Sequence, residues 1–200
     1  MTEIHIEPGL VEAVRAGDPA ARDRLLDRWL PEVLRWCLRL GGPRVDAEDA
    51  AHDVFVVVLR RIPSLREPDR FPSWIFGITR RVLARHRRQA WVRRWVPGLQ
   101  PDSFQDGPGP ATRAEHSETT RLVHEILERI PPDQREVLVL CDLEERTDAE
   151  VAALLDLPGG TVKSRLRLGR RRFRLLADEM SLLDGTPAGG PKERADEALP

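Results

Sequence analysis

Two arginine-rich segments of this sequence have the composition of polyanion-binding surfaces. Residues 75–95 contain seven arginines and no acidic residue, and residues 157–177 contain six arginines, one lysine and no acidic residue. Guanidinium groups bind phosphate through paired hydrogen bonds, and clusters of them are typical of proteins that bind nucleic acids. The formal net charge is only −1 because acidic residues gather elsewhere, notably in residues 46–53 and 144–156. A near-neutral total therefore conceals two strongly basic segments.

The second basic segment follows a helix-start signal. Thr147 and Glu150 have the spacing of a capping box, in which each side chain bonds the other residue's backbone. The short helix after them ends in residues 156–159, where glycine is typical of a helix-turn-helix turn. On the next helix, the apolar stripe consists of Val162, Leu166, Gly169, Phe173 and Leu176, and the basic side consists of Lys163, Arg167, Arg170, Arg171 and Arg174. The pattern predicts a DNA-reading helix.

The position of each residue on this helix predicts its contact. If the helix lies in a major groove, its first turns meet base edges and its later turns meet phosphates. Base contacts are expected from Thr161, Lys163, Ser164 and Arg167, and phosphate contacts from Arg165 and the arginines from Arg170 to Arg174. The alternative is a solvated basic face on an ordinary helical bundle. The capping box, the turn glycines and the stripe together favour DNA binding.

An acidic face is expected on a helix over residues 46–62. Ala47, Ala51, Val54, Phe55, Val58 and Ile62 share one side, whereas Asp46, Asp49, His52 and Asp53 lie opposite, with Glu48 at the edge. The spacing of Asp49, His52 and Asp53 is also that of half a di-iron site, but no second matching helix is found. We therefore favour a protein-docking surface. A solvated face and a metal site are the alternatives.

Aromatic and basic residues interleave on the next expected helix, which runs from about Ser73 toward Trp91. Trp74, Ile75, Ile78 and Val82 lie together, Arg80, Arg81, Arg87 and Arg88 lie across from them, and Arg85 falls near the Trp74 edge. Bases stack on aromatic rings while arginines hold the backbone, so this pattern suits single-stranded nucleic acid. Because tryptophans at helical spacing are more often core residues, we expect Trp74 in the core and Trp95 at the helix end. Trp91 is left open.

Helical periodicity dominates the chain, and no segment alternates strictly between apolar and polar residues, which predicts an all-α fold. Two small helical domains are expected, joined by a flexible linker, and the second is the helix-turn-helix. The expected boundaries are residues 1–96, a linker over 97–112, residues 113–183, and a disordered tail over 184–200. Pro31 should kink or divide the helix that begins after Asp18.

The remaining sequence features exclude several classes of protein. Cys37 and Cys141 stand alone, which argues against a zinc site or a disulfide framework. No apolar run approaches the roughly 20 residues that a membrane helix needs, and the amino terminus lacks a signal-peptide pattern. We therefore expect a cytoplasmic protein without membrane insertion.

Four motifs carry a family resemblance that extends from about Ala16 to Leu176. They are DAEDAAHDVF at residues 46–55, FPSWIFGI at 71–78, IPPDQREVL at 130–138 and GTVKSRL at 160–166. In this order, and joined by a flexible linker, they resemble the extracytoplasmic-function sigma factors of bacterial RNA polymerase.

The resemblance implies a promoter-specificity subunit with no catalytic residue, metal or cofactor. The clamp helices of the polymerase's largest subunit would bind Asp46, Glu48, Asp49, His52, Asp53 and Phe55. The loop 63–72 and the following helix would receive the minus-ten promoter element through Arg66, Arg70, Trp74, Arg80, Arg81, Arg85, Arg87 and Arg88. The helix-turn-helix would read the minus-thirty-five element through Arg135, Thr161, Lys163, Ser164, Arg165, Arg167, Arg170, Arg171 and Arg174.

The family also implies a linker that threads into the polymerase and an anti-sigma protein that masks the binding surfaces. Free in solution, the two domains have the further option of packing against each other. Family members usually carry glutamine at the place of His52, commonly asparagine and aspartate near Arg81 and Arg85, and frequently arginine-alanine at Leu168-Gly169. The promoter preference therefore does not transfer. The rival interpretation is a two-domain helix-turn-helix regulator that never joins polymerase.

Overall fold

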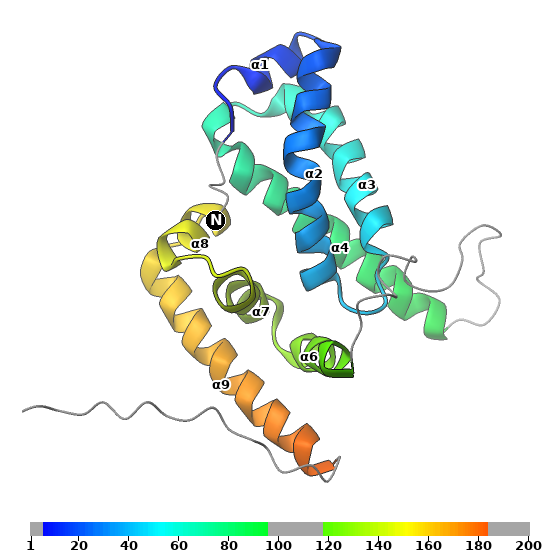
Figure 1. Ribbon diagram of the computed structural model, residues 1–200, viewed down its shortest axis with the longest axis vertical. Helices are drawn as coiled ribbons and strands as arrows, with labels where there is room; N and C mark the ends of the chain where they lie inside the picture. The colour runs from blue at the N-terminus through cyan, green and yellow to red at the C-terminus, as the bar shows by residue number, and fades with distance from the viewer. Residues whose placement is uncertain (1–5, 96–117, 184–200) are drawn as a thin grey trace, which may run out of the picture.

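Helices are the only regular elements in residues 6–95 and 118–183, the parts of the chain that the computed structural model describes (Figure 1). The all-α fold class is thus confirmed, with helices grouped on either side of the expected linker. The linker 97–112 and the tail 184–200 lie outside the described residues.

The first domain packs three long helices around an aromatic core. Its elements are α1 (Leu10–Arg15), α2 (Pro19–Gly41), α3 (Ala47–Arg61), the 3₁₀ turns η1 (Ile62–Ser64) and η2 (Pro68–Arg70), and α4 (Phe71–Trp95). In the core, the ring centroids of Trp36 and Phe76 lie 4.8 Å apart with an interplanar angle of 88°. Trp29 meets Phe71 at 5.2 Å. Each such edge-to-face pair adds about 0.5–1.5 kcal/mol beyond burial.

Aspartate caps begin the helices that carry this core. Asp18 accepts a hydrogen bond from the Ala20 amide at 2.9 Å, and Asp46 accepts from the Glu48 and Asp49 amides at 3.0 Å. Pro31 does not divide α2, which is one continuous helix, so that part of the prediction is wrong. An internal proline costs about 3 kcal/mol. Burial of Trp29 and Val33 on either side offsets this cost and holds the helix together.

The second domain comprises α6 (Glu118–Arg129), α7 (Pro132–Leu138), the π-helical turn η3 (Val139–Leu143), α8 (Asp148–Leu155) and α9 (Gly159–Leu183). Helix α7 packs across α9 and approaches it closely at Gly169, where a Cβ atom would lie 3.1 Å from the Gln134 carbonyl oxygen. The apolar stripe predicted on α9 faces this contact, with Val162, Leu166 and Gly169 buried.

The two domains pack against each other, an arrangement that the sequence left open. Helix α8 contacts α4, and α7 lies between α9 and the first domain in Figure 1. The interface brings charged residues of α2, η2 and α4 against α7, η3 and the end of α8. This arrangement determines which of the candidate binding residues are accessible.

Candidate nucleic-acid interface

The helix-turn-helix forms as predicted. The Thr147 amide donates to Glu150 Oε2 at 2.8 Å, and the Glu150 amide donates to Thr147 Oγ1 at 3.3 Å, which completes the capping box. Helix α8 then ends at Asp156, whose φ of 56° is left-handed and turns the chain into α9. Aspartate and asparagine tolerate this conformation better than most residues with a side chain. The turn sets α9 with its basic side outward.

The predicted reading face of α9 is accessible. Lys163, Ser164, Arg167, Arg171 and Arg174 are exposed, and Thr161 is half-buried. Within the described residues these four cations form no ion pair. Two neighbours are held by acids of their own domain: Arg170 Nη2 lies 2.6 Å from Asp142 Oδ1, and Arg165 Nε lies 3.4 Å from Asp133 Oδ2. The free cations can therefore meet DNA without any rearrangement.

Arg135 departs from the expectation that it faces the minus-thirty-five element. It is 8% exposed, and it lies close enough to Arg87 of the first domain for the two charges to repel. Burial, together with the nearby charge of Arg87, lowers the pKa of its guanidinium to about 10. With 8% of its surface exposed, Arg135 is not accessible to DNA in this arrangement.

The acidic face of α3 is accessible at three of the residues predicted to form it. Glu48, Asp49 and His52 are exposed, while Asp46 is half-buried as the helix cap. Asp53 forms an ion pair with Arg85 of α4, and its Oδ2 atom lies within hydrogen-bond distance, 2.8 Å, of His86 Nε2. Phe55 is buried with the apolar side of the helix, so its side chain is not part of the accessible face. Phe55 follows Ala51 at the i, i+4 spacing of one helical face, and Ala51 is also buried.

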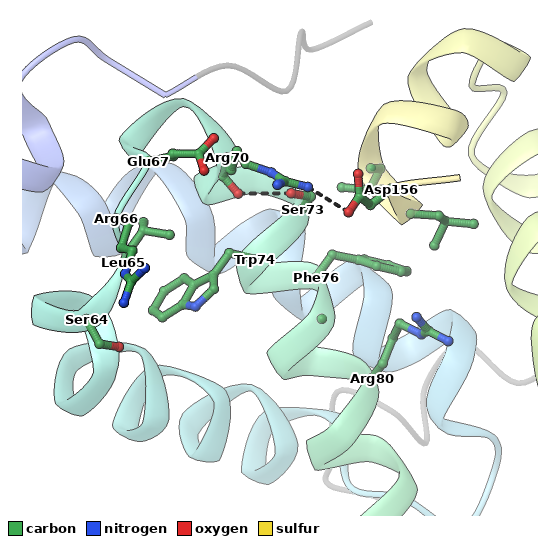
Figure 2. A pocket seen from close by; sticks show the side chains of 13 residues that line it. Ser64, Leu65, Arg66, Glu67, Arg70, Ser73, Trp74, Phe76, Arg80 and Asp156 are labelled. Carbon is green, nitrogen blue, oxygen red and sulfur yellow. Dashed lines mark hydrogen bonds and ion pairs between the residues drawn. The ribbon is translucent and has the colours of Figure 1, made fainter. Parts of the chain in front are cut away.

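The loop before α4 and the first turns of α4 line a cavity of about 380 Å³ (Figure 2). Arg66, Arg70, Trp74 and Arg80 contribute to its wall, which brings together four residues predicted to bind the minus-ten element. Trp74 is half-buried: its ring centroid lies 5.7 Å from that of Phe71, and it also lines the cavity. The expectation of a purely internal Trp74 is therefore only half right.

The other four predicted minus-ten residues do not line this cavity. Arg81 and Arg88 are exposed further along α4, and Arg85 is occupied by Asp53. Arg87 is half-buried, donates to the Leu40 carbonyl at 3.0 Å, and has its pKa lowered by burial. Trp91 is 58% exposed, whereas the side chain of Trp95 lies outside the described residues.

An ionic cluster at the domain interface was not predicted. The Glu32 carboxylate of α2 pairs with Arg146 of the second domain, and Glu144 Oε1 lies 3.2 Å from Arg39 Nε. The Glu144 side chain is fully buried, and burial raises its pKa against the opposing effect of Arg39 and Arg35. Glu32 lies on the same helical stripe as Leu25, Trp29 and Trp36. An acidic residue on an apolar stripe is the sequence signal that could have revealed this ionic cluster.

No helix in the described part of the chain is both long enough and apolar enough to cross a membrane. Within the same residues, no group of three or more histidine, cysteine, aspartate or glutamate side chains is arranged to hold a metal ion.

Comparison with known families matches both halves of the chain. The family described as Sigma-70 region 2 matches residues 25–93, and the family described as Sigma-70, region 4 matches residues 120–173. The first match spans α2 to α4 with the acidic face and the cavity, and the second spans the helix-turn-helix. Two matches in this order account for both domains.

Individual relatives agree with these matches. The chain is 32% identical over 165 residues to the ECF RNA polymerase sigma factor SigE of Mycolicibacterium smegmatis, covering 79% of this chain and 63% of that protein. It is 25% identical to the ECF RNA polymerase sigma factor SigW of Bacillus subtilis, covering 82% and 92%. Identity to the ECF RNA polymerase sigma-E factor of Escherichia coli K12 is 28%, covering 83% and 91%.

Solved structures show the same fold. CnrH, in complex with the cytosolic domain of CnrY, aligns with a TM-score of 0.59 at 23% identity, covering 85% of this chain and 96% of that one. The Bartonella quintana sigma factor RpoE, in complex with the anti-sigma factor NepR, aligns with a TM-score of 0.54 at 22% identity, covering 78% and 96%. With both regions matched in order and curated relatives along most of its length, the chain belongs to the extracytoplasmic-function sigma factors of RNA polymerase.

Proposed function

We propose that this protein directs core RNA polymerase to specific promoters and starts DNA melting there, without catalytic residues of its own. The observation that carries the proposal is the pair of region 2 and region 4 matches in chain order, each coinciding with a chemically suitable surface. The accessible cations of α9 suit duplex DNA, and the cavity with Trp74, Arg66 and Arg70 suits a flipped base and its strand.

The exposed acids of α3 are the proposed polymerase contact. Glu48 and Asp49 form a compact negative surface at the start of that helix, next to His52. Charged faces of this kind steer and orient a partner of opposite charge. We assign the partner as the clamp helices of the polymerase's largest subunit, because that is the family's polymerase contact. Because core polymerase acts in the cytoplasm, we propose that this protein acts there as well.

An anti-sigma factor is the proposed regulator. RpoE of Bartonella quintana is in complex with such a protein. We extend a partner of that class to this chain. The exposed surfaces of α3 and α9 are the ones that it would have to mask.

The experiment is co-elution of the purified chain with core polymerase, followed by run-off transcription from the promoter region upstream of its own gene. A complex and a defined start site are expected. Replacing Lys163 and Arg167 by alanine should abolish the start site while leaving the complex intact. A chain that binds its own upstream DNA but not polymerase would instead be a helix-turn-helix regulator.

A further inference from the structure

Two arginines of α9, Arg165 and Arg170, are each paired with an acid of their own domain. They lie five positions apart in the sequence. At 3.6 residues per turn, their side chains are separated by about 140° around the helix axis, on either side of the buried stripe through Leu166 and Gly169. The two arginines therefore border the basic side of α9 along its two edges.

The pair between Arg170 and Asp142 is bidentate. Arg170 Nε donates to Asp142 Oδ2 at 2.9 Å, and Arg170 Nη2 donates to Asp142 Oδ1 at 2.6 Å. A guanidinium group carries five N–H donors in a planar fork, so most of them remain after these two bonds. The Arg170 side chain is 53% exposed, which leaves the remaining donors open to a ligand from solvent. Asp142 thus fixes the direction of the guanidinium without exhausting its donors.

Arg165 is held in a looser version of the same arrangement. Its Nε atom lies 3.4 Å from Asp133 Oδ2. Asp133 belongs to the first turn of α7, which packs across α9, and Asp142 belongs to η3, which directly follows α7. The two acids therefore hold the two edges of α9 from the side on which the helix is packed, and its basic side stays clear.

The major groove of DNA has phosphates along both of its edges. The groove is about 12 Å wide, and an α-helix with its side chains is about 10–12 Å across. A helix that lies in the groove with its basic side toward the bases therefore brings its two lateral edges to the two phosphate backbones. Arg165 and Arg170 occupy these edges, and a guanidinium forms strong, directional hydrogen bonds with phosphate oxygens.

We propose that Asp142 and Asp133 are positioning residues for duplex binding, which hold Arg170 and Arg165 ready for phosphates on the two opposite strands. An arginine that is already fixed in the free protein loses less side-chain freedom when it binds a phosphate. The inference rests on the proposed function, because it requires that α9 lies in the major groove of promoter DNA.

Positioning and simple electrostatics predict opposite effects when one of these acids is removed. An acid near DNA repels phosphates, and an acid paired with an arginine also competes with phosphate for that arginine. On these grounds alone, neutralising Asp142 would strengthen duplex binding. If Asp142 positions Arg170, the same change weakens binding, because the freed guanidinium has to be ordered by the DNA itself.

The test measures the affinity of the full-length chain for a fluorescein-labelled, mixed-sequence duplex of roughly 30 base pairs by fluorescence anisotropy. A mixed sequence is suitable because phosphate contacts do not depend on sequence. Asp142→Asn should lower the affinity by about twofold to tenfold, the usual coupling within one ionic network. Asp133→Asn should lower it less, since Arg165 has only the longer contact. Asp142→Glu, which keeps the charge, should retain more of the affinity than Asp142→Asn.

A double-variant cycle with Arg170→Ala separates positioning from a structural role. When residue 170 is alanine, Asp142→Asn should no longer lower the affinity, because the side chain that it positions is gone. A loss of equal size in both backgrounds would mean that Asp142 only supports the fold, which overturns the inference. An unchanged affinity in Arg170→Ala alone overturns it as well, because Arg170 would then hold no phosphate.

The matched control is Asp178→Asn, which removes one negative charge from the same helix. Asp178 is exposed and follows Arg171 and Arg174 at helical spacing, so it lies on the basic side without holding either edge. This change should leave the affinity unchanged or raise it. A similar gain in Asp142→Asn would show that the acid competes with DNA and does not position Arg170. If the parent chain binds no duplex, the inference fails, and co-elution with core polymerase then tells whether the proposed function survives.

Discussion

The Asp53 carboxylate on α3 lies 2.8 Å from the His86 Nε2 atom on α4, and the same carboxylate also pairs with Arg85. One side chain thus joins the helix proposed to bind polymerase to the helix proposed to bind the melted strand. Its neighbour Asp49 is exposed on the same face. Two acids that look equivalent in sequence therefore have different physical roles.

Replacing Asp53 by asparagine should destabilise the first domain, because it removes the charge that holds Arg85 and His86. We expect a loss of about 0.5–1.5 kcal/mol, limited because Asp53 is partly exposed. Urea unfolding followed by circular dichroism measures this change. Asp49→Asn serves as the comparison and should change the free energy of unfolding by less than about 0.5 kcal/mol. Equal losses in both variants would show that the pairing of Asp53 contributes nothing.

Reversing the charge of Asp49 should weaken polymerase binding without unfolding the protein. Asp49→Lys places a cation in the middle of the acidic face, and we expect a loss of about tenfold or more in affinity for core polymerase. Glu12→Lys makes the same charge change on α1 and should leave the affinity unchanged, since Glu12 is exposed on a helix that packs on α2 and η1. Surface-immobilised core polymerase with the full chain in solution gives both constants. The assignment fails if the two variants behave alike.

Arg171 and Arg174 should act on all DNA sequences equally. Both are exposed late in α9, where a reading helix leaves the base edges and meets phosphates. Each alanine substitution should lower the salt slope of duplex binding by about one unit. Lys163→Ala should instead change the preferred sequence. Salt titrations on two unrelated duplexes separate these effects, and a changed preference in the arginine variants would assign them to bases.

Gly169 should be intolerant of a side chain despite its helical position. Glycine to alanine usually stabilises a helix interior by about 1 kcal/mol. At Gly169, however, the added Cβ would meet the Gln134 backbone oxygen at 3.1 Å, and overpacking costs about 1–3 kcal/mol. We therefore expect a net loss of stability in Gly169→Ala. Gly77→Ala on α4, where nothing lies within 4 Å, should gain stability, and thermal melts of both variants give the signs.

The packing of the two domains should strengthen as pH falls. Burial raises the pKa of both Glu136 and Glu144 above 4.5 while the two domains are packed together. The groups that face them are Arg80, Arg87 and Arg135 for Glu136, and Arg39, Arg35, Arg146 and Glu32 for Glu144. A raised carboxyl pKa means that packing of the two domains takes up protons, so packing is favoured below the raised values and loses this contribution as pH rises through them.

Small-angle X-ray scattering at neutral pH and at about pH 5 should show a smaller radius of gyration at the lower pH. The double variant Glu136→Gln with Glu144→Gln should lose most of this dependence, because glutamine does not titrate. A larger radius at the lower pH in the parent protein would contradict the sign of the coupling.

Local features were predicted well because neighbours along the chain determine them. The Asp46 cap, the capping box of Thr147 and Glu150, and the buried stripe through Val162 and Leu166 all formed as their spacing required. Pro31 is the exception. Its local cost is real, but burial on both sides of it is a tertiary effect that spacing near a proline does not reveal.

The sequence by itself determined that the chain is helical, which faces are apolar, acidic or basic, and that α9 has a basic side suited to DNA, because helical periodicity and capping depend on residues a few positions apart. Only the tertiary structure decided that Arg135 is buried, that Asp53 pairs with Arg85, and that Asp156 and Glu136 pair with Arg70 and Arg80 at the cavity beside the 63–72 loop. These contacts join residues dozens of positions apart, and their partners are chosen by how two folded domains fit together, which no local pattern encodes.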